Sequence, residues 1–177
     1  VQHELNPREE WMKNIIHFGG GGNSYEQNLF ASYLTSYEQI AEDTCFGGHV
    51  SSFYKTTTDP IQLNLSDSIE LLINEGVSLM TFFGHASSTG FDQNIDSPND
   101  YNNQDKYPLL IGNSCYTGNI HLASGISTSE EFVLVPNRGV IGFVAKGDVG
   151  VPTYLNQWTS KFYKNIFQTN YGKSIGQ

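Results

Sequence analysis

The sequence has few basic residues, few cysteines and no long hydrophobic run. Lysine and arginine together number 9 against 18 aspartates and glutamates, which gives a net charge of −9 at pH 7 with histidine neutral. Proteins that bind nucleic acid need clustered lysine and arginine to neutralise phosphates, so this balance argues against a nucleic-acid partner. No apolar stretch approaches the ~20 residues of a membrane-spanning helix, and we therefore expect no transmembrane segment in this chain.

Cysteine occurs only twice, as Cys45 and Cys115. Two cysteines are too few for a disulfide framework or for a structural zinc site. Cys45 stands before a Phe-Gly-Gly turn, and we interpret it as a buried structural thiol because free cysteines are among the most buried residues. Cys115 then remains as the thiol that is a candidate for chemistry.

The chain lacks an initiator methionine and a signal-peptide pattern, and residues 174–177 read as the start of another helix. Its 177 residues are enough for one domain with its own core, but not for two. We expect residues 1–177 to form a single domain that is a piece of a larger protein. The missing signal peptide therefore says nothing about location.

Motifs of nucleotide-binding enzymes and of serine hydrolases are also missing. Gly19–Gly22 follows the first apolar run, but it has neither the G-x-G-x-x-G spacing nor the Walker lysine and hydroxyl. No G-x-S-x-G nucleophile elbow is present. We expect no cofactor, and we interpret the glycine run as a flexible loop on the active-site side of the domain.

The pattern that is present alternates between short apolar runs and amphipathic segments. Because strands and helices follow one another in the order βαβαβ, loop, βαβα, we predict an α/β fold, a three-layer α/β/α sandwich with a mostly parallel sheet. The predicted strands are 14–18, 47–58, 79–83, 108–112 and 139–145, and the predicted helices are 24–43, 65–76, 127–135 and 153–169.

A loop at 88–106 interrupts this alternation, and its Asn, Asp and Gly content predicts one short turn or hairpin. Solvated side chains are the expected state of its acids, and we assign no metal site. Calcium binding is the alternative, although the spacing is not that of an EF-hand. The acids are Asp92, Asp96, Asp100 and Asp105.

Two residues that can do chemistry follow neighbouring predicted strands. His85 comes two residues after the run 79–83, and Cys115 comes shortly after the run 108–112. Ligands of open α/β sheets bind beyond the carboxyl ends of the strands, so an imidazole and a thiol are expected together there. A base near the sulfur populates the reactive thiolate at neutral pH. We predict a Cys115–His85 catalytic dyad.

Small residues around the dyad leave room for a substrate carbonyl. The backbone N–H groups of Ala86 and Cys115 are candidate donors to an oxyanion. A third group often orients the base, and here one of the aspartates of the loop 88–106 or a carbonyl is the candidate. His121 remains an alternative base, ranked below His85.

The loop that follows the predicted strand 139–145 is expected to form one wall of the specificity pocket. Asp148 in this loop suits a basic substrate side chain, whereas its glycines and Val149 suit a narrow or apolar pocket, and both alternatives stay open. The predicted substrate-binding residues are Gly84, Ser87, Asn113, Ser114, Gly147, Asp148 and Val149.

These residues carry a resemblance to the gingipain-type cysteine peptidases of the caspase-like clan. Gly84-His85 followed by small residues is similar to the histidine motif of that family, and residues 113–118 (NSCYTG) are similar to its cysteine motif. The run 83–88 (FGHASS) more closely resembles the subgroup of type IX secretion sortases of Bacteroidetes. One departure is Ala86, which stands where many family members carry a second glycine.

The resemblance implies a caspase-like fold and a cysteine endopeptidase or transpeptidase that acts through an acyl-enzyme. For the sortase subgroup it further implies removal of the C-terminal sorting domain of secreted proteins and their attachment to a cell-surface lipopolysaccharide. The partners would then be those polypeptides and other type IX secretion components. The location would be the cell surface or outer membrane of a Gram-negative bacterium. Whether the acyl group passes to water or to an amine is left open.

A second function class is a non-catalytic caspase-like scaffold or binding module within a larger secreted or surface protein. The presence of both Cys115 and His85 favours the enzyme over the scaffold.

Overall fold

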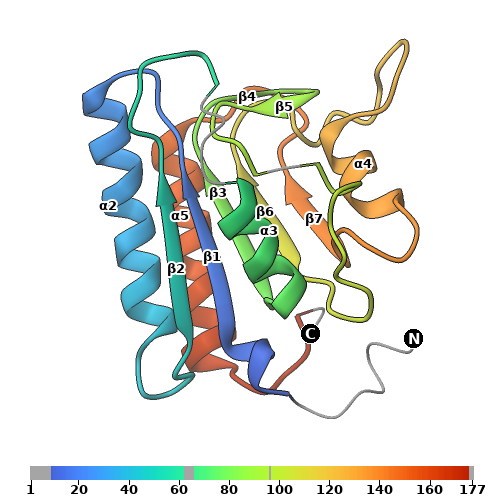
Figure 1. Ribbon diagram of the computed structural model, residues 1–177. Coiled ribbons are helices and arrows are strands. Elements are labelled where there is room, and N and C mark those ends of the chain that lie inside the picture. The colour runs from blue at the N-terminus through green and yellow to red at the C-terminus, as the bar shows by residue number, and fades with distance from the viewer. Residues whose placement is uncertain (1–8, 62–65, 96, 176–177) are drawn as a thin grey trace.

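A computed structural model describes residues 9–61, 66–95 and 97–175. Its main sheet has five parallel strands in the order β2-β1-β3-β6-β7. All five arrows point the same way in Figure 1, so the sheet has one carboxyl edge and one amino edge. The strands are β1 (Asn14–Gly19), β2 (His49–Tyr54), β3 (Leu79–Phe83), β6 (Leu109–Asn113) and β7 (Gly142–Ala145).

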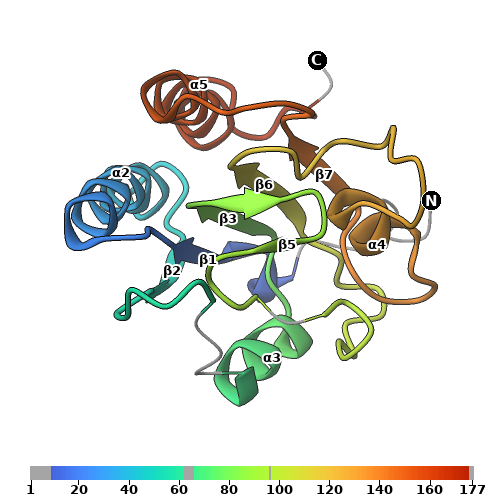
Figure 2. The same ribbon diagram turned by 90° about the horizontal axis from the view of Figure 1, so that it is seen from above.

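Helices cover both faces of this sheet, which confirms the predicted three-layer sandwich. Seen from above in Figure 2, two helices lie on one side of the strands and two on the other. The first pair is α2 (Ser24–Ala41) and α5 (Pro152–Lys164), and the second is α3 (Ser66–Glu75) and α4 (Thr128–Leu134). A 3-10 turn, η1 (Glu10–Lys13), precedes β1, and a π-helical turn, η2 (Asn165–Thr169), continues α5.

Several element boundaries differ from the predicted ones for local reasons. The strand predicted at 139–145 begins only at Gly142. Gly139 is left-handed (φ 82°), and the N–H of Val140 bonds to the carbonyl of Phe132 in α4 rather than to a neighbouring strand. The strand predicted at 47–58 is His49–Tyr54, since Gly47 is also left-handed (φ 64°).

An antiparallel hairpin, β4 (Ala86–Ser87) with β5 (Gly90–Phe91), starts directly after His85 and lies across the carboxyl edge of the sheet (Figure 2). Phe91 packs against Phe82 of β3 with ring centroids 4.4 Å apart. The N–H of Thr128 at the start of α4 donates to the Ser88 carbonyl at 2.8 Å. The hairpin is therefore fastened both to the core and to a neighbouring helix.

The core on the α2 and α5 side contains a buried polar group. His17 of β1 is fully buried, and its Nε2 lies 2.9 Å from the hydroxyl of Tyr163, which also bonds to Thr81 at 2.6 Å. Burial lowers the pKa of His17 to about 3, because desolvation disfavours the charged imidazole. The folded protein thus holds His17 in the neutral form.

One expectation about the core was wrong: Cys45 is exposed, with its Sγ 3.8 Å from the carbonyl of Gln168. Cys45 lies in the turn between α2 and β2, outside the helix and the strand that pack into the core.

We predict that His17 makes the protein less stable as the pH falls below the unfolded histidine pKa of ~6.5. Between that value and about 3 the unfolded chain binds a proton that the folded chain does not, so stability is present above pH 6.5 and is lost on acidification. From pH 6.5 to 5.0 this loss should be roughly 1 to 2 kcal/mol. His17→Gln should reduce this pH dependence in chemical unfolding, and the exposed His49→Gln should retain it. Equal slopes in wild type and His17→Gln would contradict the prediction.

Candidate active site

The two residues of the predicted dyad lie at the same edge of the sheet. β3 and β6 are adjacent and parallel, with Phe83 paired to Asn113. The N–H of Gly84 donates to the Asn113 carbonyl at 3.2 Å, which extends this pairing one residue beyond β3. His85 and Cys115 each follow two residues after the last paired position. The register therefore places His85 and Cys115 on loops that leave neighbouring strand ends.

The imidazole of His85 is held by a residue that sequence reasoning missed. Its Nε2 lies 2.9 Å from Oε2 of Glu26, in the first turn of α2, and the ring of Phe30 packs edge-on against it. The hydrogen bond to His85 is the largest cause of the lowered pKa of the Glu26 carboxyl. The two side chains are 53% and 29% exposed. A carboxylate placed this way orients the ring through a hydrogen bond.

Glu26 is separated from His85 by 59 residues, and no motif joins them. The available signal was positional, because α2 begins just after β1 at the same carboxyl edge. Asn23 caps this helix through its side chain, and an acid in the first turn of the helix points toward that edge.

Of the loop aspartates that were candidates to orient His85, Asp92 bonds its backbone rather than its ring. Its Oδ1 accepts from the His85 N–H at 3.2 Å, and its Oδ2 accepts from the Gly21 N–H at 2.8 Å. Lys55 places its Nζ 3.5 Å from the same Oδ2, and both side chains are buried. Of the other loop acids, Asp100 is exposed and Asp96 lies outside the described residues.

The glycine run has a structural role that involves these two carboxylates. The N–H of Gly21 donates to Asp92, and the N–H of Gly22 donates to Glu26 at 2.9 Å. A Cβ on Gly20 would stand 2.0 Å from Oδ1 of Asp92, so the backbone must approach without a side chain. The loop is thus a set of amide donors to protein carboxylates, which explains the glycines without a phosphate ligand.

Cys115 lies in a loop that is bonded to the loop after β7. Its Sγ accepts from the N–H of Gly150 at 3.3 Å, and the N–H of Tyr116 donates to the Asp148 carbonyl at 3.1 Å. Tyr116 is left-handed (φ 59°), which is uncommon for a residue other than glycine and typical of strained turns at active sites. No hydrogen bond among the described residues uses the N–H of Cys115 or joins its thiol to His85 directly.

The predicted substrate-binding residues fall into two groups. Gly84, Asn113 and Ser114 are buried below the surface of the site, and Asn113 accepts from the Thr159 hydroxyl at 2.7 Å. The other four are exposed at the carboxyl edge, where a substrate can reach them: Ser87, Gly147, Asp148 and Val149.

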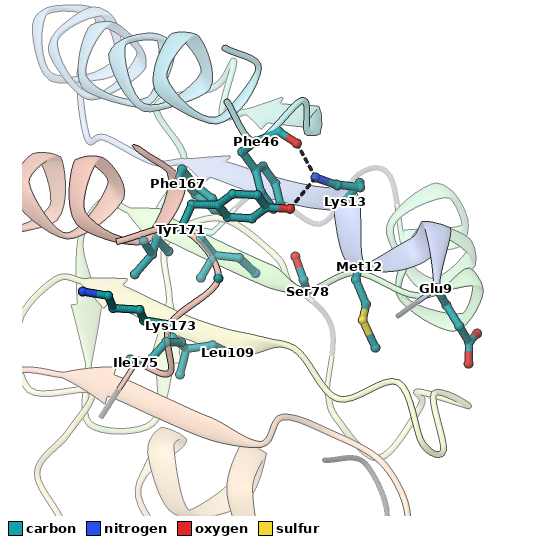
Figure 3. A pocket seen from close by; sticks show the side chains of 13 residues that line it. Glu9, Met12, Lys13, Phe46, Ser78, Leu109, Phe167, Tyr171, Lys173 and Ile175 are labelled. Atoms are coloured by element: carbon teal, nitrogen blue, oxygen red, sulfur yellow. Dashed lines mark hydrogen bonds between the residues drawn. The ribbon is translucent and has the colours of Figure 1, made fainter. Parts of the chain in front are cut away.

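Two hollows lie beside the dyad loops. One, of about 310 Å³, has His85, Ala86 and Ser87 in its wall. The other, of about 180 Å³, is lined by Asn113, Lys146 and Trp158 among others. A further cavity, of about 350 Å³, is lined by Lys13, Phe46, Leu79, Leu109 and Tyr171 among others. Figure 3 shows it near the amino ends of the strands, whereas His85 and Cys115 follow the carboxyl ends of β3 and β6.

His121, the alternative base, is exposed on the loop after Cys115 and interacts electrostatically with Glu130 at the start of α4. Within the described ranges, no three His, Cys, Asp or Glu side chains gather closely enough to hold a metal ion. In the same ranges, no helix combines the length and the apolar character needed to cross a bilayer.

Comparison with known proteins gives a family and a fold. The model of Peptidase family C25 matches residues 1–177, whereas none of the curated proteins compared with the chain matches it. A solved structure described only as a protease superposes with a TM-score of 0.70 at 16% identity, over 89% of this chain and 34% of its own. The Arg-specific cysteine proteinase gingipain R (RgpB) gives 0.67 at 12% identity, over 91% of this chain and 38% of its own.

A complex of the pro- and mature domains of RgpB from Porphyromonas gingivalis gives a TM-score of 0.65 at 15% identity, over 91% of this chain and 38% of its own. At these identities the likeness to solved structures shows a shared fold. The chain spans well under half of the length of each of these solved chains.

We predict that Gly20→Ala destabilises the protein, because its Cβ would collide with an Asp92 carboxylate that three other groups hold in place. Overpacking of this kind costs about 1–3 kcal/mol, or several degrees in melting temperature for a domain of this size. Gly90→Ala is the matched control, since a Cβ there meets nothing within 4 Å. Thermal unfolding of both variants checks this, and equal melting temperatures would show that Asp92 moves aside freely.

Proposed function

Because the chain belongs to Peptidase family C25, we propose that it is a cysteine peptidase domain that cleaves polypeptides through an acyl-enzyme. The observation that carries this proposal is the placement of Cys115 and His85 on adjacent loops at the carboxyl edge, where parallel sheets bind their ligands. The Glu26 carboxylate that holds the imidazole supplies the third member found in many nucleophile–base pairs.

In the proposed reaction the Cys115 thiol gives its proton to His85, and the sulfur forms a bond to the substrate carbonyl carbon. The bond from that carbon to the leaving nitrogen then breaks as His85 returns the proton to the amine. A thioester on Cys115 remains. Attack by water or by an amine breaks the carbon–sulfur bond and restores the thiol, which gives hydrolysis or transfer.

The negative charge that develops on the carbonyl oxygen needs donors in fixed positions. We assign this role to the N–H groups of Ala86 and Cys115, which belong to the residues that lead out of the two strand ends. The N–H of Cys115 has no other acceptor among the described residues. Removing one such donor typically slows catalysis by ~10²–10³-fold, so the oxyanion site matters as much as the thiol.

The acyl side of the substrate is assigned to the loop after β7, because that loop is bonded to the cysteine loop. Gly147, Asp148 and Val149 are exposed there. The 180 Å³ hollow beside Asn113 and Trp158 accepts a side chain of modest size. Asp148 would favour a substrate with a basic side chain at this position, and the small hollow would favour a substrate with a neutral one.

A narrower proposal is that the whole protein acts as a type IX secretion sortase of the PorU kind at the cell surface of a Gram-negative bacterium. It would cleave the C-terminal sorting domain from secreted proteins and pass the acyl group to an amine on lipopolysaccharide, together with other type IX secretion components. The support is the sequence resemblance around His85, in residues 83–88.

The alternative is a non-catalytic caspase-like scaffold or binding module. One observation favours it: the thiol is bonded to Gly150 and the imidazole to Glu26, with no direct hydrogen bond between them. Catalytic hydrogen bonds are often long or missing in active sites without substrate, so this geometry does not decide against the enzyme.

We predict that iodoacetamide labels Cys115 rapidly at pH 6–7, where an ordinary thiol is mostly protonated. The experiment uses a Cys45→Ser background, because Cys45 is exposed and would also react. Mass spectrometry reads the labelled site, and Cys115→Ala should abolish peptide cleavage while circular dichroism stays unchanged. Slow labelling of Cys115, as for a free thiol, would favour the scaffold, and cleavage by Cys115→Ala would refute the mechanism.

We further predict that His85→Ala and Glu26→Gln slow this labelling to different extents. His85→Ala removes the base, whereas Glu26→Gln keeps the base and removes only the carboxylate that orients its ring. The alkylation rate at pH 7 should therefore fall much further in His85→Ala than in Glu26→Gln. His121→Gln is the control and should match wild type, whereas slowing in that variant alone would make His121 the base.

A further inference from the structure

Asp92 forms hydrogen bonds with both the backbone N–H and the backbone carbonyl of His85. Its carboxylate accepts from the His85 N–H at 3.2 Å, and its own N–H donates to the His85 carbonyl at 2.9 Å. These two bonds fix two successive peptide units, the one before His85 and the one after it. The second of these units contains the N–H of Ala86.

The direction of the Ala86 N–H follows from this geometry. In a planar trans peptide the C=O and the N–H point in opposite directions. Because the carbonyl of His85 points at Asp92, beside β5, the N–H of Ala86 points away from that strand. The ladder geometry gives the same direction. Ala86 pairs with Phe91 and is adjacent to the hydrogen-bonded pair of His85 and Asp92. In an antiparallel ladder, bonded and non-bonded pairs alternate, so Ala86 is in a non-bonded pair and its N–H points away from the partner strand.

Lys55 holds the other end of this arrangement. Its side-chain Nζ lies 3.5 Å from Asp92 Oδ2 and 3.4 Å from the Pro60 carbonyl. The backbone N–H of Lys55 donates to the Gly19 carbonyl at 2.7 Å. Lys55 and Asp92 are 3% and 8% exposed. A carboxylate this deeply buried must be paired and hydrogen-bonded, and here its partners come from the loops after β1, β2 and β3.

Resting on the proposed peptidase function, we propose that the Lys55–Asp92 pair is a positioning device for the oxyanion donor Ala86, separate from Glu26, which positions the imidazole. The two carboxylates hold the same residue at different atoms. Glu26 bonds the ring of His85, and Asp92 bonds its main chain. Loss of Asp92 therefore disturbs the oxyanion site more than the thiol–imidazole pair, and loss of Glu26 does the reverse.

Two probes separate these effects in the Cys45→Ser background. Iodoacetamide reports the thiolate and needs no oxyanion site. The second probe is an acetylated tripeptide aldehyde, whose C-terminal residue is chosen as the one that binds the wild-type protein most tightly. It forms a tetrahedral adduct with Cys115, and the oxygen of this adduct occupies the oxyanion site. The ratio of aldehyde affinity to alkylation rate isolates the oxyanion contribution.

Asp92→Asn should weaken aldehyde binding by about 10²-fold and leave the alkylation rate at pH 7 within about threefold of wild type. Glu26→Gln is the matched control, in which both quantities should fall together. Since Asp92→Asn leaves Lys55 buried without its partner, the double variant Lys55→Met, Asp92→Asn removes both charges and guards against unfolding. It should show the same aldehyde defect with a wild-type circular dichroism spectrum.

An Asp92→Asn protein that keeps its aldehyde affinity overturns the inference, and so does one that loses aldehyde binding and alkylation in proportion. The second result would give the pair a role in stability alone. A wild-type protein that neither reacts fast with iodoacetamide nor binds the aldehyde overturns the proposed function, and with it the inference. The two failures are distinguished by the wild-type measurements alone.

Discussion

The buried carboxylate of Asp92 is the point at which the loops of the carboxyl edge meet. A charge out of contact with water is tolerated only with a counter-charge and several donors, and Asp92 finds them in Lys55 and in two backbone N–H groups. Because these donors must come very close, the loops that supply them have little room for side chains. Gly20 and Gly84 both face Asp92 at distances that exclude a Cβ. At Gly20 and Gly84 the lack of a side chain is thus tied to one desolvated charge.

The two carboxylates also divide the work of holding His85. Glu26 is partly exposed and bonds the ring, so its geometry can follow the imidazole as a proton moves. Asp92 is buried and bonds the main chain, where movement would be costly. The side chain that turns toward the thiol in the proposed mechanism and the peptide unit that stays still are therefore held by different kinds of contact. This division suits the proposed roles of His85 as a proton carrier and of Ala86 as an oxyanion donor.

Sequence reasoning reached the fold and the placement of the two central residues because both depend on local signals. The alternation of apolar runs and amphipathic segments gives the strands and helices, and their carboxyl ends then place His85 and Cys115 on one edge. Glu26, Lys55 and Asp92 were not predicted in their roles, because each depends on loops that meet only in three dimensions. Burial of Cys45 was predicted from a general tendency of cysteine, and the turn after α2 exposes it.

The contact of the Glu26 carboxylate with His85 and that of the Cys115 thiol with Gly150 join distant parts of the chain. Glu26 and His85 are 59 residues apart, and Cys115 and Gly150 are 35 residues apart. In a parallel sheet even the neighbouring strands are joined only after long stretches of chain have been ordered, so such contacts form late in folding. Cys115 and His85 therefore come into place only in a nearly complete fold. A nascent or partly folded chain has the cysteine but no assembled site, so the proposed peptidase becomes competent only once the domain has matured.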